Sequence, residues 1–147
     1  MVNTQPRQST AFARKRYETD YYLGKVGYCL KNVRECLGID PYYESAKEAW
    51  EAAKHKTVTA DPDEWPFGAP VFSERPGGSL YGHVFLAGGR FQNGQRILWQ
   101  TDATGRPGMV TPVTPAFITG VWGHRILGFS RDLNGVPIPY LLDGKGK

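Results

Sequence analysis

The chain has 147 residues, of which 40% are hydrophobic, 13% aromatic and 22% charged. This length is typical of one domain that buries a core without disulfides or a structural metal, and the composition excludes disordered, collagen-like and membrane-spanning proteins. Because most of the 18 Gly and 11 Pro follow residue 60, we expect helices in the first half and short strands with turns in the second.

The formal net charge of +4 comes from the N-terminal part of the chain. Residues 1–35 contain seven Lys or Arg against three Asp or Glu, whereas the remainder contains eleven of each. The cluster Arg14, Lys15 and Arg16 lies in a polar segment without an apolar periodicity. We therefore predict a flexible basic arm over residues 1–17, attracted to polyanions, and a single domain over residues 18–147.

Two helices are predicted after this arm. Leu30, Val33 and Leu37 recur at helical spacing and Gly38 is a natural C-terminal stop, which places Cys29 in the first turn of a short helix. A second helix begins at the S-x-x-E capping box that starts at Ser45, and His55 at its end is interpreted as structural.

Candidate strands follow at residues 70–73, 83–87, 97–102 and 125–130, separated by Gly-containing turns. Helices followed by several short strands joined by turns indicate an α+β fold with an antiparallel sheet.

The two cysteines, Cys29 and Cys36, are seven residues apart, which in a helix separates them by about 10 Å and is too far for a disulfide. Neither belongs to a C-x-x-C pair, and no second Cys or His cluster completes a zinc site. We therefore predict free thiols in a reducing compartment, and no metal or other cofactor.

Cys29 and His83 are the candidate catalytic pair. A cysteine at a helix N-terminus faces backbone N–H groups that favour the thiolate and that can also hold an oxyanion. His83 opens a strand directly after Gly82, so its imidazole is presented at the sheet edge as a general base for a thiol. His124 competes for this role, but its place before the last strand favours a structural or rim position.

Gln100 and Asp102 are the candidates for a third group that orients the imidazole. Strand alternation is expected to put both side chains on one face of strand 97–102, within reach of His83 if the two strands pair. Trp65, Trp99 and Trp122 are candidates for lining a substrate groove, although each is equally typical of a core position.

These motifs together resemble the CHAP and NlpC/P60 superfamily of papain-like cysteine peptidases and amidases. The resemblance covers roughly residues 21–140 and rests on Gly27-Tyr28-Cys29-Leu30, Ser45-Ala46-x-x-Ala49-Trp50, Gly82-His83-Val84, Gln100-x-Asp102 and the segment from Trp122 to Gly135. CHAP proteins carry Glu-x-Asn on the strand after the histidine strand, so Gln100 takes the place of the Glu and Asp102 that of the Asn. The last segment looks like the end of the peptidase domain in endolysins of actinobacterial phages.

The resemblance implies a papain-like hydrolase that cleaves an amide bond of bacterial peptidoglycan, with Cys29 as nucleophile, His83 as base and Gln100 or Asp102 as orienter. It implies no specific nucleic-acid partner, a monomer, and a location in the host cytoplasm before holin-type release, because no signal peptide follows the basic cluster. The Asp-rich calcium loop of some CHAP domains is absent before Cys29.

Alternative functions remain open. A virion tail-associated hydrolase and a catalytically silent phage protein of the same fold would have the same motifs. A nucleic-acid-binding domain driven by the basic arm is a third alternative, which the neutral charge balance of the remaining chain disfavours.

Overall fold

The computed structural model describes residues 2–24, 27–78, 81–103 and 106–142. An antiparallel six-stranded sheet with strand order β1-β6-β2-β3-β4-β5 forms its centre, and β7 and β8 form a separate hairpin. The strands are β1 (Lys56–Val58), β2 (Pro70–Glu74), β3 (His83–Arg90), β4 (Arg96–Ala103), β5 (Arg106–Val113), β6 (Arg125–Ser130), β7 (Asp132–Leu133) and β8 (Val136–Pro137). The helices are α1 (Pro6–Glu18), α2 (Cys29–Leu37), α3 (Ala46–Ala52), α4 (Pro139–Leu142) and the short turns η1 (Pro62–Glu64) and η2 (Phe117–Val121).

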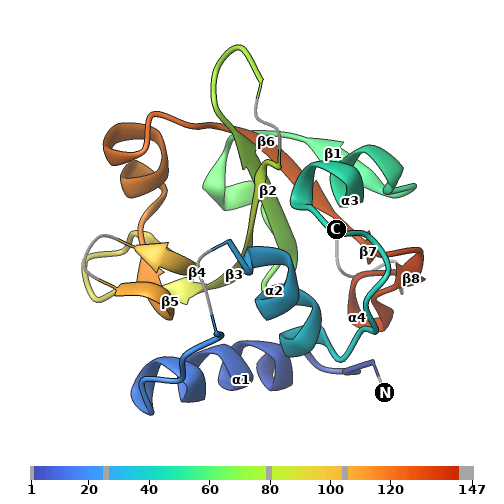
Figure 1. Ribbon diagram of the computed structural model, residues 1–147, viewed down its shortest axis with the longest axis horizontal. Helices are drawn as coiled ribbons and strands as arrows, with labels where there is room; N and C mark the ends of the chain where they lie inside the picture. The colour runs from blue at the N-terminus through green and yellow to red at the C-terminus, as the bar shows by residue number, and fades with distance from the viewer. Residues whose placement is uncertain (1, 25–26, 79–80, 104–105, 143–147) are drawn as a thin grey trace.

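The N-terminal helices pack against this sheet, which confirms the predicted α+β class. Figure 1 shows α1 and α2 beside each other, with α2 close to β3; α2 contacts β3 and β4, and α1 contacts α2 and β5. The apolar run Val84–Ala87 of β3 is completely buried between neighbouring strands and α2. None of the described helices has both the length and the apolar character needed to cross a bilayer.

The four predicted strands are confirmed as β2, β3, β4 and β6, whereas β1 and β5 were not predicted. β5 contains Pro107 and Pro112, residues that argue against a central strand because proline cannot donate a ladder hydrogen bond. The strand order places β5 at an edge of the sheet, where proline is tolerated. β1 has three residues and forms the other edge, which makes it too short for a clear alternation.

Both predicted helices are present; the first has its predicted ends, whereas the second ends at Ala52, three residues before the predicted end at His55. α2 begins at Cys29 and stops at Gly38, whose φ of 78° is a left-handed conformation that glycine adopts at little cost. α3 begins after Ser45, whose Oγ accepts a hydrogen bond from the Glu48 N–H at 3.2 Å. On the other side of α3, Trp50 packs on Phe72 of β2 with ring centroids 5.1 Å apart.

The segment predicted as a flexible basic arm differs most from expectation, because residues 6–18 form helix α1 and pack on the domain. Its buried positions are Ser9, Thr10, Ala13 and Arg16, which recur at helical spacing but are small or polar. Apolar periodicity, the main sequence signal for an amphipathic helix, is therefore missing from this segment. Arg16 of the basic cluster is therefore part of the interior, whereas Arg14 and Lys15 are exposed.

Arg16 attaches α1 to α2. Its guanidinium donates to Asn32 Oδ1 at 2.9 Å and to Glu35 Oε1 at 2.6 Å. The same group lies over the Phe12 and Tyr21 rings, at 4.7 and 4.5 Å from their centroids. Because Asn32 is completely buried, its side-chain oxygen depends on internal partners such as Arg16.

We predict that Arg16→Ala lowers the free energy of unfolding by about 2–4 kcal/mol, because it leaves Asn32 and the partly buried Glu35 without their cationic donor. Urea unfolding followed by circular dichroism measures the change. Arg7→Ala, at an exposed position of the same helix, is the control and should stay within about 0.5 kcal/mol of the wild type. Equal stabilities of the Arg16 and Arg7 variants would contradict a structural role for α1.

Candidate active site

Cys29 is the first residue of α2 and its side chain is turned toward β3. Only 6% of the residue is exposed. The backbone N–H groups of Val84 in β3 and of Leu30 approach the sulfur and favour the thiolate, but burial outweighs them and raises the pKa of Cys29 to about 11. The negative charge of Asp102 acts in the same direction as burial. The resting thiol is therefore protonated at neutral pH.

His83 is the first residue of β3 and is placed by the glycine before it. Gly82 has a φ of 66°, and a Cβ on it would lie 3.1 Å from the backbone nitrogen of Lys47 at the start of α3. The Lys47 N–H donates to the Tyr81 carbonyl at 2.7 Å. The backbone of α3 thus approaches Gly82 closely.

The His83 ring lies among aromatic neighbours. Its centroid is 4.6 Å from that of Trp122, in an edge-to-face arrangement, and 4.8 Å from that of Phe85. Burial, and to a lesser extent the nearby His124, lowers the pKa of His83 to about 3. Nε2 is buried and forms no hydrogen bond within the described part of the chain. His83 is therefore a neutral imidazole at neutral pH.

Gln100, on the adjacent strand β4, is the predicted third residue that lies beside the imidazole. It is completely buried, and its interaction with His83 opposes the effect of burial by raising the pKa of His83. Among the described residues, neither polar atom of its amide makes a hydrogen bond of ordinary length and angle. Catalytic hydrogen bonds are often loose in the absence of substrate, and the uncharged amide can orient His83 only through its oxygen.

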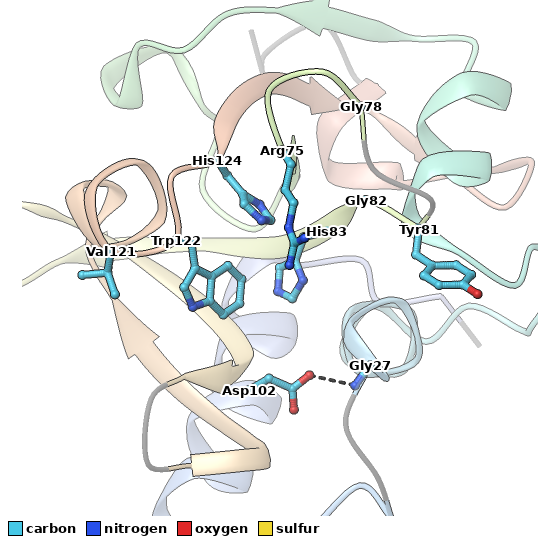
Figure 2. A pocket seen from close by; sticks show the side chains of 10 residues that line it. All are labelled: Gly27, Arg75, Gly78, Tyr81, Gly82, His83, Asp102, Val121, Trp122 and His124. Carbon is cyan, nitrogen blue, oxygen red and sulfur yellow. Dashed lines mark hydrogen bonds between the residues drawn. The ribbon is translucent and has the colours of Figure 1, made fainter.

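The regular strand alternation that was expected to carry Gln100 and Asp102 is interrupted at Asp102. The pairing of β4 with β5 is irregular between Thr101 and Ala103, and Asp102 has a φ of 68°, which turns its side chain out of the alternation. Its carboxylate accepts hydrogen bonds from the backbone N–H groups of Gly27 at 2.8 Å and Gly108 at 2.5 Å. Figure 2 shows the carboxylate turned toward Gly27. Of the two candidate orienters, the structure therefore favours Gln100.

A pocket of about 830 Å³ opens beside His83 and Asp102 (Figure 2), and neither Cys29 nor Gln100 is among its lining residues. Arg75 and His124 lie on the wall formed by β2 and the approach to β6, and Asp102 lies on the opposite wall. The lining residues are Gly27, Arg75, Gly78, Tyr81, Gly82, His83, Asp102, Val121, Trp122 and His124. The Arg75 cation and the Asp102 carboxylate at opposite sides make the pocket electrostatically asymmetric.

His124 lies at the rim of this pocket, as expected, and 6.3 Å from His83 between ring centroids. Its Nδ1 is 2.9 Å from Ser73 Oγ, and burial together with the charge of Arg75 lowers its pKa. Of the candidate groove tryptophans, Trp122 lines the pocket, whereas Trp65 and Trp99 are buried in the core.

Cys36 is a packing residue. It is fully buried on the same helix as Cys29, and its sulfur lies 3.8 Å from Asn32 Oδ1. Burial raises the pKa of its thiol to about 12. Both cysteines are free thiols, as predicted. Across the described residues, no three His, Cys, Asp or Glu side chains are grouped so that they could hold a metal ion.

Sequence reasoning missed several lining residues. Tyr81 directly precedes Gly82 and His83, so chain order alone indicated that it lies near the site. Arg75 follows β2 in a polar turn, and nothing in that pattern distinguishes it from a solvated surface cation. Figure 2 shows that its side chain is directed into the pocket, which only the tertiary structure reveals.

Comparisons with known proteins give no match: no family model, no curated protein and no solved structure is significantly similar to this chain.

The lowered pKa of His83 predicts how stability depends on pH. On unfolding, the pKa returns from about 3 to near 6.5, so the unfolded chain binds more protons between these values. Stability present above pH 6.5 should fall toward pH 3, by at most about 1.4 kcal/mol per pH unit from this residue. Urea unfolding at several pH values should give a shallower acid slope for His83→Gln than for the wild type.

The exposed His55, which lies outside the pocket, supplies the control variant His55→Gln, expected to keep the wild-type slope. Parallel acid slopes for His83→Gln and the wild type would show that His83 does not gain a proton on unfolding.

Proposed function

We propose that this protein is a peptidoglycan hydrolase that cleaves an amide bond by a Cys–His thiol mechanism on a papain-like arrangement of helix and sheet, in the manner of a phage endolysin. One observation carries the proposal: the sulfur of Cys29, at the start of α2, faces the Val84 N–H at the start of β3, directly after the buried, neutral His83. A thiol at a helix N-terminus, in the same buried region as a neutral histidine that has a polar side chain beside it, supplies the nucleophile and the base that acyl transfer requires.

The first half of the reaction forms a thioester. As the Cys29 sulfur attacks the carbonyl carbon, His83 accepts the thiol proton and the C–S bond forms. The backbone N–H of Cys29 at the N-terminal end of α2 stabilises the negative oxygen. His83 then donates the proton to the leaving nitrogen, and the C–N bond breaks to release an amine.

The second half regenerates the enzyme. A water molecule attacks the thioester carbon while His83 accepts its proton, and the C–S bond breaks to release a carboxylate. The proton on His83 returns to the sulfur, so Cys29 ends as a thiol. Gln100 keeps the imidazole facing the sulfur through both halves, as an amide does when it orients a base without adding a charge.

The pKa values favour proton transfer during attack over a preformed ion pair. Burial raises the pKa of Cys29 to about 11 and lowers that of His83 to about 3, so both groups are neutral before substrate binds. A buried thiolate–imidazolium pair would lose more solvation than either neutral group. The developing charges are thus created only while the oxyanion is also stabilised.

The pocket supports a peptide substrate. The exposed Tyr81 and Val121 offer apolar surface at its rim, with Trp122 between Val121 and His83, and Arg75 supplies a cation that suits the carboxylates of cell-wall peptides. By contrast, the nucleic-acid alternative loses support because Arg16, one of the three cations of its basic cluster, is buried and paired with Glu35.

We predict that Cys29→Ala releases no muropeptides from purified actinobacterial cell walls, because the attacking sulfur is removed. His83→Ala should be inactive as well, whereas Cys36→Ala and His124→Ala should remain largely active. Turbidity loss of the walls and mass spectrometry of the released fragments measure the reaction and identify the bond cut. Lysis by Cys29→Ala at the wild-type rate would exclude the thiol mechanism, and an inactive wild type would favour the silent structural protein.

We predict that kcat/KM of the wild type stays level through about pH 6–7 and falls only well below the ordinary histidine pKa. The reason is that burial keeps His83 neutral to about pH 3. Gln100→Glu should move the acid limb to higher pH, because a carboxylate beside His83 favours the imidazolium. Amine release from a soluble wall peptide gives the profiles, and the exposed Gln95 supplies the control variant Gln95→Glu.

An acid limb near pH 6.5 in the wild type, or superimposable profiles for Gln100→Glu and Gln95→Glu, would contradict the role given to His83 and Gln100.

A further inference from the structure

We propose that Asp102 is a positioning residue that holds the N-terminal end of α2, and with it Cys29, against the hairpin of β4 and β5. The catalytic consequence of this role rests on the proposed function, whereas the placement of Cys29 can be measured without turnover.

The two carboxylate oxygens of Asp102 join two parts of the chain. Oδ2 accepts from the N–H of Gly27, two residues before Cys29, at 2.8 Å. Oδ1 accepts from the N–H of Gly108 in β5 at 2.5 Å. One side chain thus fixes the approach to the nucleophile on the strand pair that also carries Gln100. Because both oxygens are engaged by backbone donors, a role as proton acceptor or as orienter of His83 is disfavoured.

The same hairpin holds the chain upstream of Gly27. The Leu23 N–H donates to the Gly108 carbonyl at 2.9 Å, and Tyr22 forms an isolated β-bridge with Met109. The Tyr22 ring lies so close to Gly108 that a Cβ there would overlap it. Among the described residues, Leu23 is the last with such a contact, and the Asp102–Gly27 hydrogen bond provides a further attachment two residues before Cys29.

The backbone of Asp102 departs from an ordinary strand to make this contact. Its φ of 68° lies in the left-handed region, which costs most residues about 1–2 kcal/mol and is tolerated best by Gly, Asn and Asp. The pairing with β5 changes register at this point, and the side chain is turned toward Gly27. A strained conformation that places a carboxylate at a helix start, beside a pocket, is typical of functional sites.

The charge of Asp102 also acts on the nucleophile. Among charged groups it is the one that raises the pKa of Cys29, adding to the effect of burial. Positioning and charge therefore have opposite consequences: Asp102 places the sulfur for attack while it disfavours the free thiolate. An uncharged variant of the same shape separates the two, since it should make the thiol easier to ionise and the enzyme slower.

The test compares Asp102→Asn with Asp20→Asn in the full-length protein. Asp20 is a matched control because it also has a positive φ, of 51°. Its carboxylate accepts a hydrogen bond at 2.8 Å from Arg106 of β5, the strand that carries Gly108, without contacting Gly27. Asparagine tolerates both backbone conformations. Peptide-resolved mass spectrometry of iodoacetamide labelling over about pH 6–10 reports the ionisation of Cys29 itself, and cleavage of a soluble wall peptide gives kcat and KM.

The titratable or charged groups among the described lining residues are Arg75 after β2, Tyr81 and His83 at the start of β3, Asp102 and His124 before β6. Only Asp102 changes in this comparison. We expect Asp102→Asn to label Cys29 at lower pH than the wild type and to lose about ten- to a hundredfold in kcat with little change in KM. Asp20→Asn should match the wild type in both readouts. Asp102→Glu, which keeps the charge but is one methylene too long, should lose kcat without shifting the labelling to lower pH.

Labelling and kcat of Asp102→Asn that match those of Asp20→Asn would overturn the proposal. A lower melting temperature with an unchanged Cys29 profile would also overturn it, because that is the result of a merely structural residue. If the wild type cleaves no wall peptide, the proposed function fails, while the labelling comparison still decides whether Asp102 controls the surroundings of Cys29.

Discussion

The packing of α2 on β3 is the constraint on which the rest of the site depends. Val33, Cys36 and Leu37 of α2 are completely buried, as is the run Val84–Ala87 of β3 that lies beside the helix. Burying these side chains supplies the main favourable free energy at this contact. The first residue of the helix and the first residue of the strand, Cys29 and His83, are drawn into the same water-poor region as a consequence.

Loss of water determines the electrostatics of that region. Burial is the largest contribution to the pKa of both Cys29 and His83, and it moves each group toward its neutral form. Gln100 adds a polar side chain without a charge, which avoids the cost of burying a third ionisable group next to them. The pocket above is open to solvent at Arg75 and Tyr81, so a bound peptide would complete the exclusion of water from the reacting atoms.

Helix α2 is held from two sides by polar contacts. Arg16 of α1 binds Asn32 and Glu35 on one side, and Asp102 binds Gly27 just before the helix begins. Hydrogen bonds that involve a charged group are stronger than neutral ones, so they add a specific attachment to the apolar contacts of this helix. Arg16, one of the cations of the N-terminal segment, therefore has a structural role in attaching α1 to α2.

Sequence alone determined the local features of this protein. The apolar spacing from Leu30 to Leu37, the Ser45 cap and the runs of β2, β3, β4 and β6 depend on neighbours in the chain, and each was predictable because periodicity and capping are local properties. The same holds for the positions of Cys29 at a helix start and His83 at a strand start. Tertiary structure decided the rest: α1 packs through polar residues that carry no periodic signal, β5 is a strand because an edge tolerates its prolines, and the irregular pairing at Asp102 sends that carboxylate to Gly27 while Gln100 stays beside His83. Partners distant in the sequence determine each of these outcomes, so no pattern within the segments themselves could have revealed them.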